Sequence, residues 1–251
     1  MEQTLPPVPD LRIGPLFSRA WRAFKTRPWF LVGAYLASAL LTKLLLFSVG
    51  FAMVVLFAGR PAVHDVFFTL CMGLNFVLSL GLLAISLRLW TGRPASFDML
   101  FTGFRKFWPA VGLWLAGYVF WTAMEHLQTL LSAFAASRGI ENASLVAGLA
   151  LAVPGSILAV ALSPAPLVLL ETPLGLVPSL RMALDLTLGH RWQLFFVLLA
   201  SLVFGLSGLL AFGVGLLITI PVSQILLVGA FNELVQAYAK AGDDPAIPAQ
   251  A

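Results

Sequence analysis

Long apolar runs separated by short basic segments make up almost the whole chain. A helix needs about 20 apolar residues to cross the hydrocarbon core of a membrane, so the runs predict six spans. Their expected bounds are 29–58, 63–87, 108–135, 145–170, 192–211 and 215–238. The last two share one run with no charge before Glu233, which is too long for one span at about 1.5 Å per residue. We therefore expect a turn between Gly205 and Gly215, where glycines loosen the helix.

Three segments of the chain follow one plan: an amphipathic stretch, a basic cluster, a tryptophan and a long apolar run. Trp29, Trp108 and Trp192 occupy the equivalent positions. Each unit crosses the membrane twice, so all three have the same orientation. The pattern predicts an all-α polytopic membrane protein of three helical-hairpin repeats, each preceded by an amphipathic interfacial helix. We expect repeats at 14–90, 94–171 and 173–240 in one membrane domain, 14–240, between disordered tails at 1–13 and 241–251.

The stretch before each apolar run has aromatic residues on one face and basic residues on the other, less clearly so around 180–188. This profile is typical of a helix in the headgroup layer, where each Lys or Arg contributes about 1 kcal/mol of attraction to an anionic leaflet. These helices either bind lipids or a partner, or serve only as topology anchors. The expected interfacial residues are Arg19, Trp21, Arg22, Lys25, Arg27, Trp29, Arg105, Lys106, Trp108, Arg191 and Trp192.

Charge and composition narrow the class of protein. Most of the 15 Lys and Arg residues flank the spans on one side, and only Arg60 and Arg138 flank them on the other, so the positive-inside rule predicts that both termini are cytoplasmic. Residues are 60% hydrophobic and 10% charged, against about 25% charged in soluble domains. This composition excludes a soluble globular protein, a disordered chain and a nucleic-acid binder.

One predicted span carries a stripe of polar residues. Its members recur at spacings of four and three, which puts them on one helix face; they are Tyr118, Thr122, Glu125, Thr129 and Ser132, with His126 beside them. A charge in mid-span costs about 2.5–3.5 kcal/mol, so we expect the stripe to face other helices or water. Lys43 lies at a similar depth in the first span, and we predict a Lys43–Glu125 pair.

The predicted pair has two interpretations. It is either a structural staple, with Lys43 free to snorkel outward, or the lining of a site for a polar headgroup or a proton.

Prolines in the predicted spans also have two interpretations. Each proline removes a helix hydrogen bond, and the freed carbonyl needs a partner inside a membrane. The expected kinks are at Pro154, Pro164, Pro166 and Pro221. They either shape the bundle only or mark a site, as broken helices do in transporters.

Recognisable catalytic chemistry is absent from the sequence. The one cysteine, Cys71, makes neither an intrachain disulfide nor a cysteine metal cluster. The chain has no phosphate-binding loop, no nucleophile elbow, no zinc-protease motif and no dinucleotide fingerprint. We therefore expect no enzyme activity, no cofactor and no metal.

The middle of the chain resembles a known family. The run GRPASFDMLFTGFRKFWPAVGL, and the later run VPGSILAVALSPAPLVLLETPLGLVPSLRMALDLTLGHRW, are similar to signatures of six-span bacterial inner-membrane proteins. These are related to YciC-type proteins and to the membrane domain attached to some glycerophosphodiester phosphodiesterases. Pro154-Gly155, Glu171, Pro221 and Tyr238 fit the pattern, whereas Ala183 stands near the usual Ser. The resemblance implies a multi-pass inner-membrane protein without assigned catalysis. The phosphodiesterase activity is not carried over to this chain, because the catalytic barrel is missing here.

Two functions are consistent with these features. The first is a non-enzymatic inner-membrane protein that binds lipids or a membrane-protein partner in envelope homeostasis. Its lipid partners would be anionic headgroups, and no nucleic acid would bind. The alternative is a small transporter or flippase subunit that uses the intramembrane face of Lys43, Glu125 and His126.

Overall fold

The computed structural model describes residues 11–56, 61–173, 175–211 and 213–241, and this part of the chain is all-α. The elements in order are α1 (Ile13–Thr26), α2 (Pro28–Leu56), α3 (Pro61–Trp90), the 3₁₀-helix η1 (Phe97–Lys106), α4 (Phe107–Ser137), α5 (Ala143–Leu162), α6 (Ala165–Glu171), α7 (Leu176–Thr187), α8 (Arg191–Ser207), the 3₁₀-helix η2 (Gly208–Ala211) and α9 (Leu216–Ala241). The tails expected to be disordered lie outside the described residues, except for 11–13 and 241. Leu11 is buried against the fold.

Six helical segments are long and apolar enough to cross a membrane, which confirms the predicted number of spans. They are Pro28–Ala52, Phe67–Trp90, Phe97–Ser137, Ala143–Glu171, Arg191–Leu210 and Leu216–Ala239. The predicted turn is also confirmed, because α8 ends at Ser207 and α9 begins at Leu216. Gly213 in this turn has a φ of 81°, a backbone conformation that glycine adopts without steric cost.

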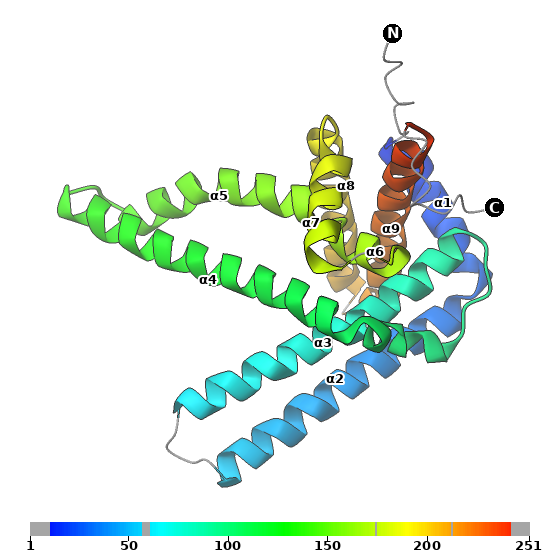
Figure 1. Ribbon diagram of the computed structural model, residues 1–251, viewed down its shortest axis with the longest axis horizontal. Helices are drawn as coiled ribbons and strands as arrows, with labels where there is room; N and C mark the ends of the chain where they lie inside the picture. Colours follow the sequence, from blue (N-terminus) through cyan, green and yellow to red (C-terminus); the bar gives the residue numbers. More distant parts are fainter. Residues whose placement is uncertain (1–10, 57–60, 174, 212, 242–251) are drawn as a thin grey trace.

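The spans pair as three hairpins, α2–α3, α4–α5 and α8–α9. Figure 1 shows α2–α3 and α4–α5 extending in different directions from a central region, where α9 lies beside α1. The degree of burial follows this arrangement. In an 18-residue stretch of each span, 61% and 67% of the residues are buried in α3 and α9, against 6% to 22% in the other four spans. The centre of the molecule is therefore built on α3 and α9, and most of the remaining apolar surface faces outward.

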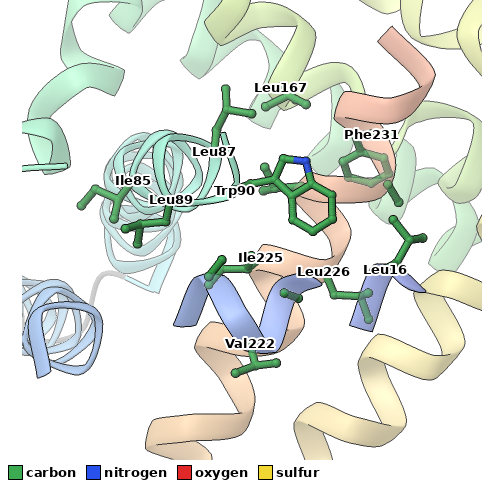
Figure 2. Close-up of a cluster of buried hydrophobic side chains, with 14 of the residues drawn as sticks. Leu16, Ile85, Leu87, Leu89, Trp90, Leu167, Val222, Ile225, Leu226 and Phe231 are labelled. Carbon is green, nitrogen blue, oxygen red and sulfur yellow. The ribbon is translucent and has the colours of Figure 1, made fainter. Parts of the chain in front are cut away.

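Trp90 is the largest side chain at this centre. Figure 2 shows its indole ring among side chains from α1, α3 and α9, such as Leu16 and Phe231. The ring lies against Gly229 of α9, where an added Cβ would come within 2.6 Å of it. Glycine at this position thus allows α3 and α9 to approach closely around one aromatic side chain.

The segment 97–106, expected to be an amphipathic helix, is a 3₁₀-helix packed on α3. A 3₁₀-helix places residues three apart on one face, and its buried residues, Leu100 and Gly103, have that spacing. Gly103 meets the backbone of Val77, and Gly81 of α3 meets the backbone of Leu100. The two glycines thus bring the backbones of η1 and α3 into close contact.

The four prolines have two different roles. Pro154 lies inside α5 and Pro221 inside α9, which are the positions where a proline kink was expected. Pro164 and Pro166 do not kink a continuous helix, because α5 ends at Leu162 and these prolines begin α6. Proline is favoured in the first turn of a helix, where its missing N–H has no intrahelical partner to lose.

Candidate functional site

Three hydroxyl groups of the α4 polar stripe donate hydrogen bonds within their own helix. Thr122 donates a hydrogen bond to the carbonyl oxygen of Tyr118 at 2.9 Å, Thr129 to that of Glu125 at 2.9 Å, and Ser132 to that of Thr129 at 2.8 Å. Such back-bonding removes the need for a partner on another helix. The expectation that the stripe faces other helices or water stays a prediction.

Glu125 does not pair with Lys43 in this structure. Its Oε1 accepts a hydrogen bond of 2.6 Å from Nε1 of Trp121, one turn earlier on α4. No described residue forms an ion pair with Lys43, which is exposed on α2. Equal depth does not bring the two side chains together, because α4 packs on α5 and diverges from α2 (Figure 1).

A groove of about 500 Å³ lies between α4 and α5, and Glu125 is part of its wall. The α4 side also carries Phe120, Trp121 and Gln128, and most of the lining is apolar. Small residues hollow out the groove; they are Gly117, Gly148, Ala152, Gly155 and Ala159. The groove is not among the sites predicted from the sequence, although the spacing of Gly148, Ala152 and Gly155 on one face of α5 is a signal that could have indicated it.

A second groove, of about 740 Å³, lies between α5, α8 and α9. Its polar groups are mostly engaged: Ser201 donates to the Ser223 carbonyl at 2.9 Å, and the Tyr35 hydroxyl donates to Gln224. The Ser223 hydroxyl is buried without a partner in the described structure. Ser156 and Ala159 of α5 border both grooves.

Two of the expected interfacial basic residues contact other helices of the protein. Arg19 forms a 2.8 Å ion pair with Glu233 of α9, and its guanidinium lies 4.2 Å from the centre of the Trp90 ring. Lys106 donates hydrogen bonds to the carbonyl oxygens of Leu169, at 2.5 Å, and Thr172. These carbonyls belong to the C-terminal end of α6, which attracts a cation. Both residues thus join helices, a role that their spacing in the sequence does not reveal.

Replacing Lys106 with methionine is expected to reduce the free energy of unfolding by about 1.5–3 kcal/mol, the usual range for hydrogen bonds to a charged group. The neighbouring Arg105 is exposed, so Arg105→Met is the matched control and should change stability by less than about 0.5 kcal/mol. Unfolding of both variants in detergent, followed by circular dichroism, measures the difference. Equal stabilities would show that the carbonyl contacts of Lys106 do not hold α6.

The remaining interfacial residues lie mostly on the surface. Trp29, Trp108 and Trp192 are 85%, 79% and 75% exposed, and each is the second residue of the helix that begins a hairpin. Arg22, Lys25, Arg27 and Arg105 are also exposed, whereas Trp21 is half-buried. Arg191 is partly buried, and its Nε has no partner in the described structure.

Among the described residues, no three His, Cys, Asp or Glu side chains lie close enough together to hold a metal ion. The resemblance to six-span inner-membrane proteins remains a prediction. The chain matches no family model, no curated protein and no solved structure.

Proposed function

We propose that this protein is a non-enzymatic, multi-pass membrane protein that binds anionic lipid headgroups where its hairpins begin. The observation that carries the proposal is the equivalent, highly exposed position of Trp29, Trp108 and Trp192. Tryptophan is enriched at the membrane–water interface, because its ring is apolar while its N–H forms hydrogen bonds. Three such residues at matching helix positions support a common interfacial level for the starts of the three hairpins.

Basic side chains close to these tryptophans supply the attraction to anionic lipids. Arg22, Lys25 and Arg27 precede Trp29, and Arg105 precedes Trp108. Each basic residue near an anionic leaflet contributes about 1 kcal/mol. The three exposed basic side chains before Trp29 would therefore favour anionic over neutral lipids by about 3 kcal/mol. Arg138 follows the opposite end of α4 and would lie in the other headgroup layer.

The charge asymmetry supports a cytoplasmic location for both termini. The six apolar helices support a location in a membrane. The resemblance to bacterial inner-membrane proteins supports the inner membrane as that location. In this proposal the protein organises lipids or a membrane-protein partner in envelope homeostasis, and it needs no cofactor.

Lipid retention tests the proposal. We expect the triple variant Arg22→Gln, Lys25→Gln and Arg105→Gln to lose bound anionic lipid. The protein is reconstituted in bilayer discs of equal phosphatidylglycerol and phosphatidylethanolamine, extracted with mild detergent, and its bound lipids are counted by native mass spectrometry. The bound ratio of phosphatidylglycerol to phosphatidylethanolamine should fall at least threefold.

The matched control keeps every charge: Arg22→Lys, Lys25→Arg and Arg105→Lys should retain the ratio of the unmodified protein. Arg138→Gln removes one charge at the other end of α4 and should also leave the ratio nearly unchanged. An unmodified protein that retains both lipids equally would contradict the proposal, and so would a neutral triple variant with an unchanged ratio.

A further inference from the structure

The groove between α4 and α5 combines a carboxylate with an apolar wall inside a candidate membrane span. Glu125 borders it, and apart from Gln128 and Ser156 the lining is glycine, alanine, leucine, methionine and aromatic side chains. The volume of about 500 Å³ is within the range of sites for drug-sized molecules, about 300–1,000 Å³. The groove therefore has room for an organic molecule with one polar group.

The space comes from missing side chains on both helices. A Cβ built on Gly117 of α4 or on Gly155 of α5 would meet no atom within 4 Å. At Gly148 the added atom would approach Nε2 of Gln128 to 3.2 Å, so this amide of α4 lies against α5 in the groove. Open space beside Gly117 and Gly155 means that a larger side chain could fill the groove without displacing the backbone.

The carboxylate has unused binding capacity. Two oxygens accept about four hydrogen bonds, and within the described chain one side chain, Trp121, bonds to Glu125. No Lys or Arg of the described residues forms an ion pair with it. A carboxylate in a membrane span normally has a partner of opposite charge or lines a functional pathway, so this groove favours a cation.

The surroundings indicate which kind of cation fits. A hard metal ion needs six or more oxygen ligands, or several waters, whereas this wall offers one carboxylate and few other oxygens. Trp121 and Phe120 present aromatic rings in the same groove, and such rings attract organic cations through their negative faces. A phospholipid is a poor match, because its phosphate would be repelled by Glu125.

We propose that the α4–α5 groove binds a lipophilic organic cation, which places its charge against Glu125 and its apolar body against Trp121, Phe120 and the glycine-lined wall. This site uses none of the basic residues at the hairpin starts. The cation is a second ligand, opposite in charge to the anionic lipids of the proposed function. Binding of the cation and binding of the lipids do not depend on each other.

Equilibrium binding of tetraphenylphosphonium to the full-length protein in detergent tests the site. We expect saturable binding at one site per chain. Tetraphenylborate has the same shape and the opposite charge, and it should bind at least tenfold more weakly. Replacement Glu125→Gln should weaken tetraphenylphosphonium binding at least tenfold, whereas Glu125→Asp should retain a large part of the affinity.

A second pair of variants tests the groove itself. Gly155→Leu should weaken tetraphenylphosphonium binding at least tenfold by filling the open space. Gly50→Leu, at another glycine with nothing within 4 Å, on α2, should leave binding unchanged. Thermal unfolding of each variant establishes that it is folded.

Three results would overturn the proposal: no saturable tetraphenylphosphonium binding to the unmodified protein, equal binding of the borate, or unchanged affinity in folded Glu125→Gln. Weaker binding in Gly155→Leu with full affinity in Glu125→Gln would identify the groove as a site for neutral apolar molecules, such as acyl chains, and would equally reject a cation site.

Discussion

Replacing Gly81 with alanine is expected to separate η1 from α3 and to reduce the free energy of unfolding by about 3 kcal/mol or more. The added Cβ would lie 2.0 Å from the carbonyl oxygen of Leu100 and 2.4 Å from its carbonyl carbon. Overpacking usually costs about 1–3 kcal/mol, and more when the structure cannot shift. Here the obstructing atoms are backbone on a second element, so relief requires that η1 move away.

Gly117→Ala is the matched control, because it adds the same methyl group to a helix where nothing lies within 4 Å. Alanine is a better helix former than glycine by about 1 kcal/mol, so the control should be neutral or stabilising. The midpoints of thermal unfolding of both variants in one detergent measure the effect. Equal midpoints would contradict the close backbone contact between α3 and η1.

Replacing Trp90 with alanine is expected to cost about 3–5 kcal/mol, the usual range for a large aromatic residue in a core. Its side chain is 3% exposed and packs against Gly229. The substitution would also remove the aromatic face beneath the guanidinium of Arg19, 4.2 Å away. Loss of this residue should therefore loosen α1, α3 and α9 together.

Trp29→Ala is the control for this prediction, since it removes the same side chain from a position that is 85% exposed. It should change the free energy of unfolding by less than about 0.5 kcal/mol. Chemical denaturation in detergent, followed by circular dichroism, compares the two variants. Similar losses at Trp29 and Trp90 would show that α3 and α9 do not form the stable centre of the fold.

The six spans and the turn between the last two could be predicted from the sequence alone. Both depend on quantities that are local to the chain, namely the length of an apolar run and the glycines that interrupt it. The turn between Ser207 and Leu216 lies where the run becomes too long for one crossing. The helix face that carries Glu125 could also be predicted, because a helix repeats every 3.6 residues.

Only the tertiary structure decided which side chains meet. Periodicity identifies which residues share a helix face, but not which helix lies beside that face. Similar depth in the membrane therefore predicts a Lys43–Glu125 pair, although α2 and α4 diverge in the structure (Figure 1). The spacing of Arg19 and Lys106 in the sequence does not show that they bind Glu233 and the end of α6.

The α4–α5 groove likewise depends on two helices meeting at their small residues. Neither helix contains the groove by itself, because the space is defined by Gly117 on one wall and Gly155 on the other. Local physics thus determined the elements of this protein, and the packing between elements distant in sequence determined its candidate sites.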